Sequence, residues 1–191
     1  NGLKWLGLNW EGELVRQSEK VSIHTNYLKK LLESKKAFYC FHTTEELEEE
    51  QKNQALEKIS FKHECEHKNI SSEEVVNKLK TNNAIIRLKT PYKKIIFKDL
   101  VKGEVEFDTS LLGDISLAKN LDTPLYNFAV VVDDHESEIT HIIRGEDHLS
   151  NTPKQILIIE ALGFNQPEYA HLPLILATDR SKLSKRHGAV S

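Results

Sequence analysis

The chain has 191 residues, of which 39% are hydrophobic and 29% charged, and its formal net charge is −3 at pH 7. This composition excludes a disordered chain, and the length fits one domain or one domain with an insertion. Because 26 basic residues face 29 acidic ones, a general polyanion-binding surface is excluded as the main feature, although local basic patches are not. No stretch approaches the roughly 20 apolar residues of a membrane span.

The cysteine content and the chain ends add two expectations. Two cysteines are too few for a disulfide scaffold, and no secretory signal pattern is visible. The chain begins with Asn1, contains no methionine and ends at Ser191, just after a basic loop. We expect an internal piece of a longer, cytoplasmic protein.

Helix and strand patterns alternate at the start of the chain. Residues 25–36 place leucines on one face and lysines on the other, which predicts an amphipathic helix. The aromatic stretch 37–41 predicts a strand.

Two capping boxes predict the next helices. Thr43 and Glu46 have the spacing in which each residue bonds the other's backbone amide, and a polar helix to about Lys58 follows. Ser71 and Glu74 open a second helix in the same way.

The middle of the chain reads as a small α+β module. Short apolar stretches separated by Asn-Asn, Thr-Pro and Gly-Asp turns predict four strands, at residues 84–89, 95–98, 104–107 and 115–119.

The last third predicts a parallel strand–helix–strand unit. Residues 139–144 are a strand candidate, and 151–162 form the clearest helix, with Pro153 in its first turn and Gly163 after its end. The second strand is expected in the apolar run 174–177.

Asp133, Asp134 and His135 follow the apolar stretch 126–133. They could form a metal or acid–base cluster. We favour a turn at the end of a strand, because such polar residues are typical of loops.

The loop at residues 178–188 places four cations within seven residues: Arg180, Lys182, Lys185 and Arg186. Such a loop after a strand can surround a polyphosphate and stabilise charge that develops on a transferring phosphate. A solvated basic loop is the alternative that the residues leave open.

A second polar cluster, Arg144 to His148, follows an apolar strand directly. Ligands bind outside the carboxyl ends of strands in open α/β sheets. Arg144 could hold a carboxylate through two parallel hydrogen bonds, and Glu146 or Asp147 could accept from a ribose or an amino group. A local salt bridge explains these residues equally well.

Two Cys-x-His pairs lie 25 residues apart, Cys40 with His42 and Cys65 with His67. Thiolate and imidazole ligands suit tetrahedral zinc, and four of them complete a structural site. His63 is a possible substitute ligand. The alternative is two free cysteines in a reducing compartment.

Residues 123–135, 139–155 and 170–176 resemble bacterial glutamyl-tRNA synthetases closely. The segment 182–186 looks like that family's version of the KMSKS signature of class I synthetases. Shorter stretches near the start fit the same family, so the resemblance covers essentially the whole chain.

The resemblance implies an α/β fold, a Rossmann-type class I catalytic domain interrupted by an α+β insertion that binds the tRNA acceptor end. Residues 1–39 would end the first catalytic half, 40–121 would form the insertion, and 122–191 would form the second half. The family's HIGH motif is expected before Asn1 and its helical anticodon-binding part after Ser191. By itself the chain is expected to be inactive or weakly active.

The resemblance also implies the reaction. ATP, with Mg²⁺, would activate L-glutamate as glutamyl-adenylate, and the glutamyl group would pass to the 3′ end of tRNA(Glu). No enzyme nucleophile is needed, so catalysis would be positioning and charge stabilisation. Family members usually act as monomers.

Residue roles follow from the same resemblance. Lys182 and Lys185 would be catalytic, and Tyr126 and Arg144 would bind glutamate. The expected contacts to ATP are Asp147, His148, Ser184 and Lys185. Val130 stands where some members have an asparagine that touches glutamate.

The zinc positions of zinc-containing members match Cys40, His42, Cys65 and His67, with His42 in place of a cysteine. Other members lack the site, so zinc is an open expectation.

Three rival identities are weighed against this one. The truncated paralogue that glutamylates a modified base of tRNA(Asp), a glutamyl-Q synthetase, shares the fold, but the segment after Lys185 and the run 149–153 argue against it. Glutaminyl-tRNA synthetase is disfavoured for the same reasons. A non-catalytic, zinc-bearing RNA-binding module leaves the loop at 182–186 unexplained.

Overall fold

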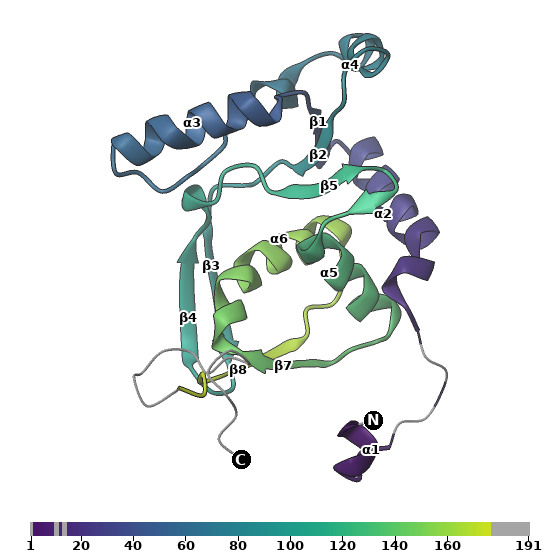
Figure 1. Cartoon of the computed structure of the whole chain (residues 1–191), viewed down its shortest axis with the longest axis vertical. Helices are drawn as coiled ribbons and strands as arrows, with labels where there is room; N and C mark the ends of the chain where they lie inside the picture. Colours follow the sequence, from purple (N-terminus) through teal and green to yellow (C-terminus); the bar gives the residue numbers. More distant parts are fainter. Residues whose placement is uncertain (1, 10–11, 13–14, 177–191) are drawn as a thin grey trace.

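The structure, a computed structural model, describes residues 2–9, 12 and 15–176 (Figure 1). Its helices are α1 (Gly2–Trp5), α2 (Val21–Glu33), α3 (Thr44–Leu56), α4 (Ser72–Leu79), α5 (Tyr126–Glu136) and α6 (Thr152–Leu162). Its strands are β1 (Ala37–Cys40), β2 (Ile85–Leu88), β3 (Lys94–Asp99), β4 (Gly103–Asp108), β5 (Ser116–Asn120), β6 (Thr123–Pro124), β7 (His141–Gly145) and β8 (Glu168–Leu172). Short 3₁₀ helices cover Gln17–Glu19, Glu66–Asn69, Thr109–Leu111 and Glu146–Asn151. None of the helices described is long and apolar enough to cross a membrane.

The strands form two sheets of four. One is antiparallel, in the order β1-β2-β5-β6. The other has the order β4-β3-β8-β7; it joins the antiparallel hairpin β3-β4 to the parallel strands β8 and β7. The carboxyl ends of β3, β7 and β8 therefore point the same way, and the polar residues that follow β3 and β7 gather at one edge.

Local sequence signals explain the starts of helices α3 and α4. Both capping boxes are present: Thr43 with Glu46 opens α3, and Ser71 with Glu74 opens α4. These predictions and the predicted strand at 37–41 are confirmed. The predicted helix at 25–36 begins four residues earlier, at Val21, and ends at Glu33.

The parallel strand–helix–strand unit is confirmed, but the position predicted for its second strand is wrong. β7 and β8 pair in parallel, with Ile142 opposite Tyr169, and α6 connects them. The second strand lies at Glu168–Leu172, before the predicted run 174–177. Its central residues are buried although one is a histidine, because His171 meets a buried carboxylate. Polar residues in the strand concealed it from a search for apolar runs.

The predicted turn at Asp133–His135 is also wrong, because these residues form the last turn of helix α5. Phe128, Val131 and Val132 face the core from this helix. Periodicity alone does not separate a short apolar helix from a buried strand.

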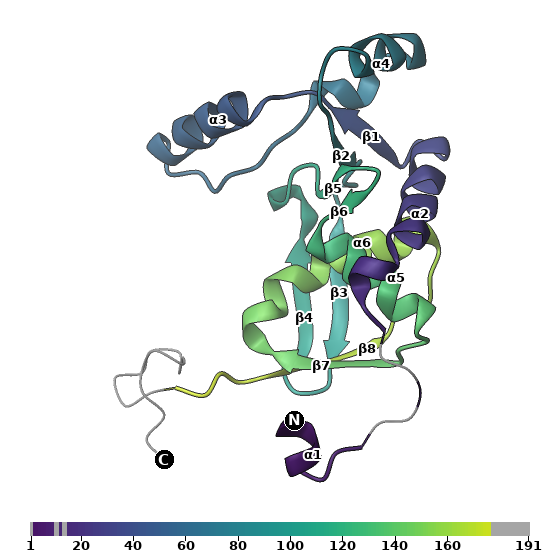
Figure 2. The ribbon, with the colours of Figure 1, turned by 45° about the vertical axis from the view of Figure 1, so that its right-hand side comes forward.

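One hydrophobic core joins both sheets, and Figure 2 shows α5 and α6 beside them. Leu31 of α2, Leu88 of β2, Phe128 of α5, Leu157 of α6 and Tyr169 of β8 all belong to this core. Although hairpin β3-β4 lies within residues 40–121, it pairs with β8. The division at residues 40 and 121 stays a prediction, and the sheet pairing crosses it.

Candidate active site and metal centre

Arg144, at the carboxyl end of β7, is held by three hydrogen bonds. Its Nε donates to His171 Nε2 at 3.2 Å, and its Nη2 donates to Thr152 Oγ1 at 2.9 Å and to Gln155 Oε1 at 2.8 Å. The guanidinium has five N–H groups, so only the two on Nη1 are unused by hydrogen bonds among the described residues. A carboxylate that approaches Arg144 would meet Nη1.

Buried groups surround this guanidinium. His171 is fully buried, and its Nδ1 lies 2.6 Å from Asp99 Oδ2. Burial opposes ionisation of Asp99, but hydrogen bonds from His171 and from the amides of Lys102 and Val101 outweigh it and lower the pKa of Asp99 to about 2. The buried end of Arg144 therefore faces a buried histidine that is itself paired with a buried carboxylate.

Tyr126 and His148 lie together. Tyr126, at the first turn of α5, is half exposed, and its hydroxyl lies 3.5 Å from His148 Nδ1. Asp147 lies over Gly145: a Cβ at Gly145 would come within 2.5 Å of the Asp147 carboxylate. Glu146 forms an ion pair with Lys102 and accepts from the amide of Leu174 at 3.2 Å.

The expected KMSKS-type residues Lys182, Ser184 and Lys185 lie outside the described residues. The structure brings together Tyr126 and His148, and it places Arg144 at the end of the same strand that leads to Asp147 and His148.

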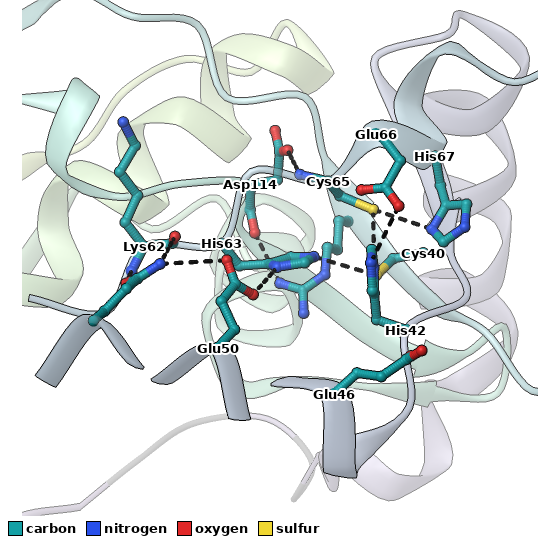
Figure 3. A network of polar contacts seen from close by, with 12 residues as sticks. Cys40, His42, Glu46, Glu50, Lys62, His63, Cys65, Glu66, His67 and Asp114 are labelled. Atoms are coloured by element: carbon teal, nitrogen blue, oxygen red, sulfur yellow. Dashed lines mark hydrogen bonds and ion pairs between the residues drawn. The ribbon is translucent and has the colours of Figure 1, made fainter. Parts of the chain in front are cut away.

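The Cys/His residues converge at the end of β1 (Figure 3). Ligand atoms of Cys40, His42, His63 and Cys65 all lie within 4.8 Å of one another. Cys40 Sγ is 3.5 Å from His42 Nδ1 and 3.6 Å from His63 Nε2, and Cys65 Sγ is 3.6 Å from His42 Nδ1. Both cysteines are free and fully buried.

These distances fit a tetrahedral zinc ion. Zinc binds sulfur at about 2.3 Å and nitrogen at about 2.0–2.1 Å, which in a tetrahedron places the two ligand atoms about 3.5 Å apart. Hydrogen bonds from Cys65 and then from His63 and His42 lower the pKa of the Cys40 thiol, although burial opposes this, and contact with Cys40 raises the pKa of the Cys65 thiol. The pair already favours one thiolate, the form that binds metal.

His63, rather than the expected His67, completes the set of four. Its Nδ1 lies 2.5 Å from Glu50 Oε2 of α3, so its Nε2 is free to face the thiols. His67 Nδ1 lies 3.4 Å from Cys65 Sγ but also accepts from the amide of Phe41 at 3.3 Å, and His67 groups instead with His42 and Glu66.

A glycine positions His63 through its backbone. Gly113 has a φ of +62°, and a Cβ there would lie 2.6 Å from the His63 carbonyl oxygen. The next residue, Asp114, donates its amide to that carbonyl at 2.8 Å and accepts the Cys65 amide at 2.9 Å. The Gly-Asp turn therefore holds two of the four candidate ligands in place.

Sequence reasoning missed the residues that hold Arg144. Asp99, Thr152, Gln155 and His171 are at most 1% exposed. Thr152 and Gln155 lie in the predicted helix 151–162, whereas Asp99 follows the predicted strand 95–98 and His171 precedes the predicted run 174–177. One signal could have revealed these residues: a polar side chain at a position that a strand or helix pattern places in the core, because such a side chain needs a buried partner.

The whole chain, residues 1–191, matches the family model described as "tRNA synthetases class I (E and Q), catalytic domain". The chain therefore belongs to this family of class I synthetase catalytic domains. The predicted resemblance is confirmed, since its relatives are glutamate–tRNA ligases.

Those relatives are close. The chain is 49% identical over 192 residues to glutamate–tRNA ligase 1 of Caldanaerobacter subterraneus subsp. tengcongensis, and 50% identical over 191 residues to the glutamate–tRNA ligase of Aquifex aeolicus. The alignments cover 100% and 99% of the chain and 40% of each relative. A crystal structure of a glutamate tRNA ligase from Elizabethkingia meningosepticum matches with a TM-score of 0.87 and 35% identity, over 97% of this chain and 41% of that one. The chain thus spans about 40% of the length of these relatives.

Proposed function

We propose that this chain is the central catalytic part of a glutamate–tRNA ligase, which activates L-glutamate with ATP and transfers it to tRNA(Glu). The observation that supports this most directly is Arg144: its guanidinium is held on one side by three acceptors, and Nη1 stays available at the carboxyl end of β7. A fixed cation at that edge suits an acidic amino acid.

Glutamate recognition is assigned to Arg144 and Tyr126. Arg144 would bind the side-chain carboxylate through Nη1, and the exposed Tyr126 hydroxyl, beside His148, would bind the other end of the amino acid. His148 and Asp147 would contact ATP. Arg144 lies at the end of β7, Tyr126 begins α5 after β6, and Asp147 and His148 lie in the 3₁₀ turn Glu146–Asn151 after β7.

Phosphate chemistry is assigned to Lys182 and Lys185, with Ser184 between them, through their match to the KMSKS signature. Their charges would stabilise the pentavalent α-phosphate and the leaving pyrophosphate. Mg²⁺ accompanies ATP as part of the substrate.

The finer architecture is also a proposal. It is a Rossmann-type domain in which residues 40–121 are an insertion that contacts the tRNA acceptor end. The polar helix α3, which buries none of its residues, fits an element on the surface of that insertion. We further propose a monomer in the cytoplasm, where free buried thiols such as Cys40 and Cys65 stay reduced.

Zinc is proposed as the metal held by Cys40, His42, Cys65 and a histidine. The geometry favours His63 as that histidine, and the resemblance favours His67. Bound zinc would supply folding energy to the loop between α3 and α4, and it has no step in the reaction.

The test of the function is ATP–pyrophosphate exchange by the complete protein that carries this chain, with tRNA, with and without glutamate. We expect exchange that depends on glutamate, followed by glutamylation of tRNA(Glu). Charging of tRNA(Asp) instead would favour the glutamyl-Q paralogue. RNA binding without exchange would favour the non-catalytic module.

Lys185 offers the sharpest variant. In Lys185→Ala the loss of charge on the transferring phosphate should lower the exchange rate by about 10²–10³-fold. The exposed lysine variant Lys29→Ala is the matched control and should retain the wild-type rate. Unchanged exchange in Lys185→Ala would contradict the proposed role.

A further inference from the structure

A buried polar chain links the loop after β3 to the guanidinium of Arg144. It runs from Asp99 to His171 and Arg144, and then through Gln155, whose Nε2 donates to Asn127 Oδ1 at 3.1 Å. Asn127 is the neighbour of Tyr126 on α5. Buried polar groups are costly unless they are paired, so this chain is a built structure with defined donors and acceptors.

The proton positions in it follow from the donor inventory. Arg144 Nε–H only donates, so His171 Nε2 must accept. The Thr152 hydroxyl lies 3.0 Å from the same nitrogen and accepts from Arg144 Nη2, so it donates its own proton to His171 Nε2. A neutral imidazole that accepts at Nε2 carries its proton on Nδ1, where Asp99 Oδ2 lies at 2.6 Å. A protonated His171 would instead direct a second N–H at a cation.

Asp99 is itself fixed. Its Oδ1 accepts from the amides of Val101 at 3.0 Å, Lys102 at 2.9 Å and His171 at 3.2 Å. Because the β3–β4 turn supplies two of these amides, the carboxylate cannot turn away from His171 without losing them.

We infer that Asp99 and His171 are positioning residues for amino-acid recognition: Asp99 holds His171 in the tautomer that accepts from Arg144, and this orients the guanidinium so that Nη1 faces the substrate carboxylate. This inference rests on the proposed function, since it names glutamate as the group that Nη1 meets. A misplacement of about 1 Å in such a contact can lower catalytic efficiency by about 10²-fold.

Substitutions separate this role from simple packing. In Asp99→Asn the amide can donate to Nδ1, which moves the histidine proton to Nε2 and directs it at Arg144. His171→Leu removes the acceptor. In His171→Gln the side-chain oxygen can still accept from Arg144 Nε.

The first measurement is the KM for glutamate and for ATP in exchange assays on the complete protein. We expect Asp99→Asn and His171→Leu to raise the KM for glutamate by about tenfold or more, with the KM for ATP unchanged, and His171→Gln to recover most of the loss. Asp108→Asn, in the same hairpin but exposed, is the matched control. Equal effects on both KM values, or no recovery by glutamine, would overturn the inference.

The second measurement needs no activity. Nitrogen-15 shifts of His171 in the labelled wild-type protein report which ring nitrogen carries the proton. The expected result is a neutral ring protonated at Nδ1, and a proton on Nε2 overturns the inference even if the protein activates glutamate normally. Absence of glutamate-dependent exchange in the wild type would contradict the proposed function instead, so the two failures are distinguishable.

Discussion

Burial opposes ionisation of two carboxylates on this side of the molecule, but their pKa values shift in opposite directions. Asp99 is 1% exposed and receives enough hydrogen bonds to keep its charge, whereas Asp134 on α5 is half-buried and its pKa is raised by burial, with Arg144 opposing that effect. The number of hydrogen-bond donors around each carboxylate therefore decides whether its ionised form stabilises or destabilises the folded protein.

Asp99 should make the folded state sensitive to acid. Its folded pKa of about 2 lies below the ordinary aspartate value of 3.8. The group therefore contributes stability above pH 4, about 2 kcal/mol, which is lost as the pH falls through 2. Asp99→Asn should lower the free energy of unfolding at pH 7 and much less at pH 2, measured by urea denaturation. An equal loss at both pH values would contradict this.

Asp134 should change the stability of the folded protein with pH in the opposite direction. Because its pKa is raised in the folded state, its charge destabilises the protein at neutral pH, and the penalty disappears as the pH falls below the unfolded pKa. Asp134→Asn should raise the melting temperature at pH 7 and have little effect near pH 3. The exposed carboxylate variant Glu138→Gln is the control. A lower melting temperature at pH 7 would show that the charge is stabilising.

Among the elements, helix α3 is held in place by polar contacts. None of its residues is buried, and Gln54 exchanges hydrogen bonds with the backbone of Lys62 at 2.7 and 2.9 Å. Glu50 adds the contact to His63. The capping box starts the helix, and these contacts tie it to the loop that contains Lys62 and His63.

Zinc binding should therefore order α3. Glu50→Gln weakens the hydrogen bond between residue 50 and His63 Nδ1. Hydrogen bonds to the ring nitrogen of a metal-binding histidine typically contribute 10–100-fold to metal affinity. We expect the zinc dissociation constant to rise within that range and amide exchange to increase in α3, while Glu49→Gln, exposed on the same helix, changes neither. Equal zinc affinity in both variants would contradict this role of Glu50.

Cysteine and histidine variants test the metal itself. Zinc stoichiometry measured on metal-replete protein should approach one per chain and fall in Cys65→Ser, because the thiolate ligand is lost. Loss of zinc in His63→Ala but not in His67→Ala would assign the fourth ligand to His63, and the reverse would assign it to His67. Wild-type protein without zinc would remove the site.

At the scale of the whole molecule, a shared core ties the two sheets together. Phe128 is fully buried and packs edge-on against His24 of α2, which bonds Asp133 at 2.9 Å. Sheet β1-β2-β5-β6 and sheet β4-β3-β8-β7 therefore contact the same cluster of side chains.

Unfolding should accordingly be cooperative across both sheets. Phe128→Ala should lower the free energy of unfolding by about 3–5 kcal/mol, because it leaves a cavity in the shared core. Amide exchange followed by mass spectrometry should show faster exchange in β2 and β8 together. Faster exchange in one sheet alone would indicate two independently stable units.

The sequence by itself determined the local features and the family. Thr43 and Ser71 specify helix starts, because capping involves residues only three apart, and the Cys-x-His pairs and the strand before Arg144 were recognisable as motifs. Tertiary structure decided the rest: α5 is a helix, β8 includes His171, and His63 lies with Cys40, His42 and Cys65. Each of these depends on a partner distant in the chain, such as Asp99 for His171 or Gly113 for His63, and a pattern of neighbouring residues contains no information about such partners.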